Sequence, residues 1–179
     1  MSNFLRHTKT YLVGHMQYSN GRDWREYAEK ELGSLNITAF NPYKHPFLKD
    51  IDEGEKKREE MKLAIEQGDY EKAAAWMRDV RSYDLNLVDR SDFIIAHLIP
   101  HVASWGSGEE LVTAVRMKKP IFVSIEGGKK KTPLWILGQI PPNYIYGSIE
   151  EVIAMIKKID SGEKEIDSDR WRLLREDLR

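Results

Sequence analysis

Apolar residues are distributed along this chain in two patterns. Short, continuous apolar runs that end in glycine, proline or a charged residue are typical of strands buried on both faces of a parallel sheet. Longer segments whose apolar residues recur every three or four positions are typical of amphipathic helices. The short runs predict five strands, at 10–14, 36–40, 92–98, 120–125 and 143–146.

Helical spacing occupies much of the chain between these runs. We expect helices at 21–33, 69–89 and 148–159, each with one apolar face. The face predicted for the first helix carries Trp24, Tyr27, Ala28 and Leu32. The stripe predicted for the second helix contains one acidic residue, Asp84, among Ala73, Met77, Val80, Leu87 and Val88.

Strands that alternate with helices predict an α/β fold. We expect a single doubly wound (flavodoxin-like or Rossmann-like) open parallel sheet of five strands with helices on both faces, in one domain over 1–160. The segment at about 44–71 has more charged than apolar residues, which favours a solvated helical insertion or lid, and we assign it no chemistry. The charged segment 161–179 is expected to be a tail or a docked helix.

Charge and composition narrow the classes of function. The 28 Lys and Arg nearly balance the 29 Asp and Glu, so the chain has no global field that would attract nucleic acid or an anionic membrane. No apolar run approaches the roughly 20 residues that span a bilayer. The absence of cysteine excludes disulfides and thiolate sites and favours a reducing compartment, so we expect a cytoplasmic protein.

The sequence offers little for a metal or cofactor. His97 and His101 are four residues apart but lie on either side of Pro100, so they would not share a helix face as metal ligands. No G-x-G-x-x-G motif is present, and E-G-G-K-K-K-T lacks the spacing of a phosphate-binding P-loop. We therefore expect no metal and no cofactor.

The candidate site follows from the fold. In open parallel sheets, ligands bind beyond the carboxyl ends of the strands where the strand order reverses, which selects the loops at 14–17 and 99–108. The second loop leads directly into the adjacent glutamates Glu109 and Glu110. We expect Glu109, about 100° round the helix, to be the solvated neighbour.

Glu110 has two interpretations. Ser107 and Glu110 have the spacing of a capping box, in which the glutamate only stabilises the start of a helix. Alternatively, the helix dipole keeps Glu110 ionised, and the small Gly106 and Gly108 let a substrate approach. An ionised carboxylate in such a crevice is a candidate nucleophile for the anomeric carbon of a sugar.

Three blocks carry a family resemblance: Y-L-V-G at 11–14, D-L-N-L-V-D-R-S-D at 84–92 and G-S-G-E-E-L-V-T-A at 106–114. In these blocks the chain resembles the nucleoside 2-deoxyribosyltransferases and the related 2'-deoxynucleoside 5'-monophosphate N-glycosidases. The resemblance covers roughly 9–124, and 44–71 looks like an insertion that the family does not need.

The resemblance implies roles for three residues. Glu110 would be the nucleophile that attacks C1' of the deoxyribose, Asp84 would contact the base and manage the proton on its leaving nitrogen, and Tyr11 would hold the glutamate in line. Taken alone, Asp84 could instead pair with Arg81 or Arg90, and Tyr11 could be an ordinary strand aromatic.

The resemblance also implies a substrate-binding set. Gly14 matches the family's glycine in the first loop, and His15 and Gln17 follow it without matching a clear motif residue. Ser104 stands where transferases acting on free nucleosides usually carry aspartate and the monophosphate hydrolases carry serine. Because a carboxylate would repel a phosphate and a hydroxyl can donate to it, Ser104 favours a nucleotide substrate.

The same resemblance implies a homo-oligomer. In the family, the loop after the next strand completes the 5' end of a neighbouring subunit's site, and here that loop carries Lys131 and Thr132. We expect Ser107, Gly106 and Gly108 to complete the substrate-binding set on their own chain.

These inferences predict an N-deoxyribosyl enzyme. It would cleave the glycosidic bond of a 2'-deoxynucleoside or its 5'-monophosphate and pass the sugar to another base or to water, with no nucleic acid or membrane as partner. The alternatives are a ribonucleotide N-glycosidase, or a nucleotide-binding sensor module without catalysis on the same fold.

Overall fold

The computed structural model describes residues 3–16, 20–44, 46–47, 52–102 and 104–164. Five parallel strands form one open sheet in the order β2-β1-β3-β4-β5, the flavodoxin-like order. They are β1 (Lys9–Gly14), β2 (Thr38–Phe40), β3 (Phe93–Leu98), β4 (Ile121–Ile125) and β5 (Ile145–Tyr146). The predicted fold class is confirmed.

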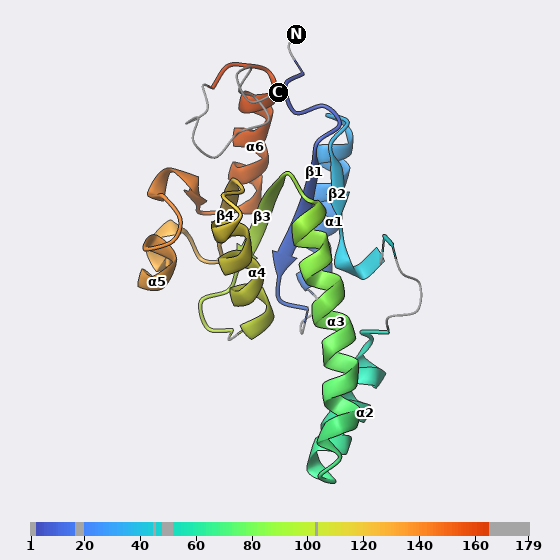
Figure 1. The fold of residues 1–179 in the computed structure, drawn as a ribbon. Coiled ribbons are helices and arrows are strands. Elements are labelled where there is room, and N and C mark those ends of the chain that lie inside the picture. Colours follow the sequence, from blue (N-terminus) through green and yellow to red (C-terminus); the bar gives the residue numbers. More distant parts are fainter. Residues whose placement is uncertain (1–2, 17–19, 45, 48–51, 103, 165–179) are drawn as a thin grey trace.

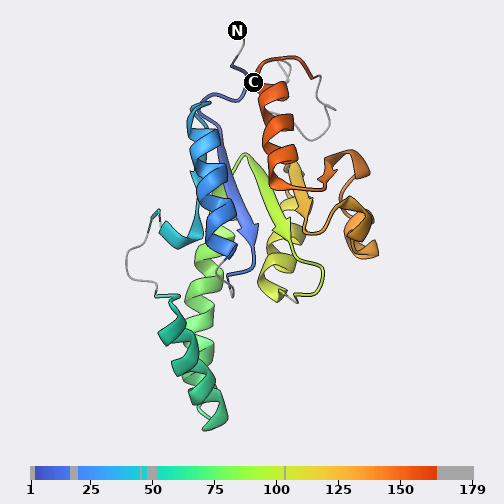
Figure 2. The same ribbon diagram turned by 180° about the vertical axis from the view of Figure 1, so that it is seen from behind.

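Helices cover both faces of the sheet (Figure 1). On the face toward the viewer lie α3 (Tyr70–Arg90) and α4 (Trp105–Arg116). Figure 2 shows the opposite face, covered by α1 (Asn20–Gly33) and α6 (Ile149–Asp160). The central strands are apolar along most of their length because helices on both sides exclude water from them.

Two strands are shorter than predicted, for local reasons. Asn36 has a positive φ of 57°, and the amide of Ile37 donates to the carbonyl of Leu32, so this stretch is a turn that ends α1 before β2 begins. At the other edge, Pro142–Tyr144 forms a 3-10 turn, which leaves only two residues for β5.

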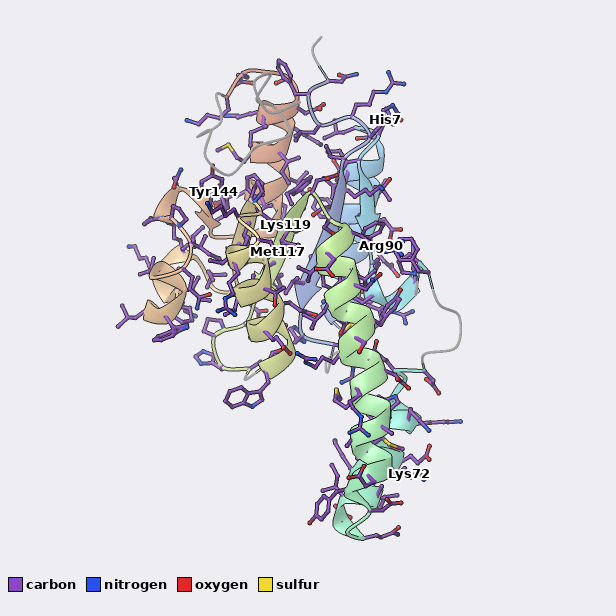
Figure 3. The ribbon with its side chains drawn as sticks, in the orientation of Figure 1. His7, Lys72, Arg90, Met117, Lys119 and Tyr144 are labelled. Atoms are coloured by element: carbon purple, nitrogen blue, oxygen red, sulfur yellow. The ribbon has the colours of Figure 1, made fainter. Side chains whose placement is uncertain are left out.

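A helical arm extends beyond the carboxyl ends of the strands (Figure 1). It is formed by α2 (Glu55–Glu66) packed against the first half of α3, with Gly68 at a positive φ of 82° in the tight turn between them. Figure 3 places Lys72 near the far end of this arm and Arg90 beside the sheet, so one helix belongs to both the arm and the core.

Short elements complete the chain near both edges of the sheet. They are the 3-10 turns Pro42–Lys44, Lys129–Lys131 and Pro142–Tyr144, and the one-turn helix α5 (Leu134–Leu137).

The predicted inward face of α1 needs one correction. Tyr27 is exposed, and Arg25 is buried in its place beside Trp24, Ala28 and Leu32.

Candidate active site

The site lies where the strand order reverses, between the carboxyl ends of β1 and β3. These two strands are paired along their length, with Gly14 opposite His97 at the last position. The helix α4 begins at the same edge, and α3 passes it on the way to the arm (Figure 1). Side chains from β1, α3 and α4 can therefore converge on one point.

Tyr11, Asp84 and Glu110 meet at that point, one from each of these elements. The Tyr11 hydroxyl donates a 2.9 Å hydrogen bond to Oε1 of Glu110. Tyr11 and Glu110 are buried, and Glu110 retains only 5% of its exposure. Oδ1 of Asp84 is also buried, without a hydrogen-bond partner in the described part of the chain. The three residues that the resemblance singled out are thus neighbours in space.

Burial raises the pKa of both carboxyl groups. Loss of solvent raises the pKa of Glu110 to about 7, although the hydrogen bond from Tyr11 and the charge of Arg25 oppose this rise. Loss of solvent, followed by the charge of Glu110, raises the pKa of Asp84 to about 8. Because the negative charge on Glu110 favours a proton on Asp84, the pair suits a carboxylate beside a carboxylic acid.

The capping-box interpretation of Glu110 is wrong. The N-cap of α4 is Ser104, three residues earlier than predicted, and its side chain accepts from the amide of Ser107. Ser104 also donates to the Ser107 hydroxyl at 2.8 Å. Glu110 therefore lies in the second turn, where no free amide needs it, and its side chain is turned to Tyr11.

The two arginines that could have paired with Asp84 have other partners in the structure. Arg81 forms a bidentate ion pair with Glu109, whose side chain is 40% exposed, and the guanidinium of Arg90 lies 4.5 Å from the centre of the Phe47 ring. Neither arginine pairs with Asp84, so the alternative of a surface ion pair for Asp84 is not what the structure contains.

A cavity of about 270 Å³ opens above the three residues. It is lined by Tyr11, Asp84 and Glu110 together with most of the predicted substrate-binding set, Gly14, His15, Ser104, Gly106 and Ser107. Gly108 lines a second cavity of about 190 Å³, which shares His15, Ser104 and Ser107 with the first. Gln17 lies outside the described residues. The two cavities therefore meet at the N-terminus of α4.

Two histidines, His15 and His97, line the second cavity. Loss of solvent is the main cause that lowers the pKa of both His15 and His97. Nδ1 of His97 lies 2.8 Å from the Ser124 hydroxyl. Trp135 and Ile136 of α5 close the far side of this cavity.

Two solved structures have a fold similar to that of this chain. A 2-deoxyribosyltransferase from the psychrotolerant bacterium Bacillus psychrosaccharolyticus matches with a TM-score of 0.57 at 17% identity, over 83% of this chain and 95% of the other. The chain has the 2-deoxyribosyltransferase fold. A conserved protein from Enterococcus faecalis V583 matches with a TM-score of 0.51 at 17% identity, over 86% and 99%. No protein-family model matches the chain, and no curated protein matches it significantly.

Within this deoxyribosyltransferase fold, a buried arginine shapes the first loop. Arg25 donates to the backbone carbonyls of Leu12, Gly14, His15 and Gly21, at 2.6 to 3.2 Å. Its guanidinium lies 4.5 Å from the centre of the Trp24 ring. A Cβ at Gly14 would approach the His97 carbonyl to 2.9 Å, so only glycine fits between the two strands there. In the sequence, the feature that could have indicated a buried role for Arg25 is its position as a charged residue beside the apolar face of a predicted helix.

The arm adds two side chains that the sequence did not reveal. Glu53 and Arg58 line the same cavity as Glu110 and Asp84, and they form an ion pair at 3.3 Å. The charge of Glu53 raises the pKa of both site carboxyls. The segment at 44–71, to which the sequence analysis assigned no chemistry, therefore contributes two residues to the lining of this cavity.

Lys131 is exposed and Thr132 is partly buried, and neither lines a cavity of its own chain, although the next residue, Pro133, lines the second cavity. The Thr132 hydroxyl donates to the carbonyl of Lys129 at 2.5 Å, and the Lys131 side chain packs over Gly127. Their predicted contribution to a neighbouring chain stays a prediction.

In the part of the chain that the structure describes, no three His, Asp or Glu side chains are grouped so that they could hold a metal ion. Among the same residues, no helix has the length and apolar character needed to cross a membrane.

Proposed function

We propose that this protein is an N-deoxyribosyl enzyme that cleaves the glycosidic bond of a 2'-deoxynucleoside or its 5'-monophosphate. The observation that carries the proposal is the hydrogen-bonded pair of Tyr11 and Glu110 beside Asp84, at the floor of a cavity on a deoxyribosyltransferase fold. One ionised and one protonated carboxyl group are what a two-step glycosyl transfer needs.

In the first step, a carboxylate oxygen of Glu110 attacks C1' of the sugar. The C1'–N bond breaks, its electron pair passes to the base, and Asp84 delivers a proton to the leaving nitrogen. Tyr11 holds the attacking carboxylate in one orientation, which reduces the entropy lost in the transition state. In the second step, water or another base attacks C1', Glu110 leaves, and the proton of the attacking group returns to Asp84.

The 5' end of the substrate would lie at the start of α4. The cavity is lined there by Ser104, Gly106 and Ser107. The space around Gly106 is open, because a Cβ added at this glycine would meet no other atom within 4 Å. A hydroxyl and the free amides of a helix N-terminus suit a phosphate, which supports a 5'-monophosphate as substrate.

The active unit in this proposal is a homo-oligomer in which Lys131 and Thr132 complete a neighbour's site. Trp135 is 79% exposed and Trp105 is 92% exposed, which gives an interface apolar area near both cavities. Ile136, the residue after Trp135, is partly buried against the core and adds little to this area. Sedimentation that finds full activity in a monomer would remove this part of the proposal.

The test is release of free base. The protein is incubated with the common 2'-deoxynucleosides, their 5'-monophosphates and the matching ribonucleotides, with and without a second base, and products are separated by chromatography. Base release from deoxy substrates supports the proposal. Binding without release would indicate a sensor module, and release from ribonucleotides alone would indicate a ribonucleotide N-glycosidase.

A further inference from the structure

The second cavity, of about 190 Å³, begins where the 5' end of the proposed substrate would lie. It shares His15, Ser104 and Ser107 with the cavity above Glu110, so the two cavities meet at these residues. From there it extends between the start of α4 and the segment that contains α5, and Trp135 of α5 forms part of its wall (Figure 1). The glycosyl transfer proposed above uses no residue that lines this cavity alone, so that reaction gives the cavity no function.

The wall of the second cavity is mainly apolar. Among the described residues that line it there is no Asp, Glu, Lys or Arg, and its apolar lining includes Leu98, Pro100 and Leu111. Loss of solvent is the main cause that lowers the pKa of His15 and His97, so at pH 7 both carry less positive charge than a solvated histidine. An uncharged group therefore fits this wall, whereas a second phosphate would find no cation in its described lining.

The junction of the two cavities offers a hydrogen-bond donor for a single phosphate. Ser107 is buried, with 5% of its surface exposed, and its hydroxyl accepts a 2.8 Å hydrogen bond from Ser104. No described residue accepts the hydrogen of the Ser107 hydroxyl, so this group can donate to an oxygen held at the junction. A phosphate diester keeps the oxygens that accept such a bond, and its single negative charge suits a junction without a cation better than the nearly two charges of a monoester.

The size of the second cavity fits one ring. An apolar cavity of roughly 150 Å³ takes up benzene, so a cavity of about 190 Å³ has room for an aromatic ring. The indole of Trp135 borders the cavity and is 79% exposed, because its own chain covers little of it. An indole in this place offers a flat surface against which a second ring can pack.

We propose that the protein takes 2'-deoxynucleoside 5'-phosphodiesters whose second ester group carries an uncharged ring. The deoxynucleoside lies above Glu110, the phosphate lies at Ser104 and Ser107, and the ring on the phosphate occupies the second cavity against Trp135. This assignment rests on the proposed function for the location of the sugar and its 5' end, but it concerns binding and can be tested without turnover.

The test compares compounds that differ only in the group on the 5' oxygen. For each of the four common 2'-deoxynucleosides, the 5'-monophosphate, its methyl ester, its phenyl ester and the 5'-diphosphate are titrated by calorimetry into the Glu110→Gln protein, so that no substrate is consumed. The methyl and phenyl esters have the same charge, so the difference between them reports the ring. Burial of the ring predicts a Kd at least about 10-fold lower for the phenyl ester than for the methyl ester. Base release by the unmodified protein is measured in parallel.

Two neighbouring residues of α5 provide the matched comparison, in the same Glu110→Gln background. Trp135→Ala removes the indole from the wall and should reduce the advantage of the phenyl ester to about 3-fold or less. Leu134→Ala removes a side chain that is 86% exposed and lines neither cavity, so it should leave the advantage unchanged. Sedimentation checks that the variants assemble alike. Val102→Phe, which adds a ring to another part of the wall, should also remove the advantage and keeps the test valid if Trp135→Ala alters assembly.

The outcomes separate this inference from the proposed function. Equal affinity for the methyl and phenyl esters, or an advantage of the phenyl ester that survives both Trp135→Ala and Val102→Phe, overturns the inference. A diphosphate that binds more tightly than the phenyl ester also overturns it, because the second cavity would then hold charge. Base release without any preference for the phenyl ester overturns the inference and leaves the proposed function intact. An advantage that depends on Trp135, without base release from any compound, supports the inference and contradicts the proposed function, and failure to bind any of the compounds overturns both.

Discussion

Substitution of Glu110 by glutamine should abolish activity and stabilise the fold at the same time. Glutamine keeps the shape of the side chain and an oxygen that can accept from Tyr11, but it cannot attack C1'. Removal of a nucleophile should lower kcat by several orders of magnitude. A catalytic residue can destabilise the fold in which it acts. When such a residue is replaced, activity is lost and stability increases.

The size of the stabilisation follows from the burial of Glu110. Its pKa rises from 4.5 in the unfolded chain to about 7 in the fold, which corresponds to about 3 kcal/mol of unfavourable ionisation. Since the folded protein binds this proton more tightly, the cost is absent below about pH 4.5, grows between pH 4.5 and 7, and is complete above pH 7. Because the new amide also loses solvent, we expect a net gain of about 1 to 3 kcal/mol at pH 8, or roughly 2 to 10 °C in Tm.

Calorimetric melts at pH 8 and pH 4.5, together with base-release assays, check this expectation. The adjacent Glu109→Gln is the matched control, because it removes the same charge from an exposed ion pair with Arg81 and should leave activity and Tm nearly unchanged. A Glu110→Gln protein that melts lower at pH 8, or that retains activity within about 10-fold, would refute the reasoning.

Three further predictions concern the same cavity. The pH profile of kcat/KM should rise as Glu110 ionises near pH 7 and fall as Asp84 ionises near pH 8, and Asp84→Asn should remove the fall; a flat profile from pH 6 to 9 counts against the assignment. Arg25→Gln should move the rising limb to higher pH, because the positive charge of Arg25 lowers the pKa of Glu110; an unmoved limb in a folded variant would leave Arg25 a purely structural role. Ser104→Asp should reduce kcat/KM for a monophosphate at least about 10-fold and spare the nucleoside, and equal effects on both would place the 5' end elsewhere.

The sequence was sufficient for the fold because the relevant signals are local. Each apolar strand run and each helical stripe is decided by residues next to one another in the chain, and all five strands were predicted to within two residues at each end. The strand β5 begins two residues later than predicted because Pro142, whose ring favours a turn, starts the 3-10 turn that precedes this strand. The α1 stripe was in error at one position, where Arg25 replaces an apolar residue by pairing with backbone carbonyls that no local pattern reveals.

The site was predictable only where a motif carried it. Tyr11, Asp84 and Glu110 come from blocks whose order and spacing suggested a common site, and the fold brings them together. The helix start was misplaced because Ser104 and Ser107 both have capping chemistry, and only the backbone decides between them. Glu53 and Arg58 were missed because a charged, solvated segment gives no sign of which few residues turn inward at its base.

The central claim is that the sugar becomes covalently attached to Glu110, and intact-protein mass spectrometry tests it most directly. The protein is mixed with excess deoxy substrate or with a 2'-fluorinated analogue, which slows breakdown of a glycosyl intermediate, then quenched in acid and mapped by peptide digestion. If Glu110 is the nucleophile, we expect a mass increase of one sugar unit, located on Glu110 and absent from the Glu110→Gln protein. Base release without an adduct, continuing at the same rate in Glu110→Gln, would contradict it.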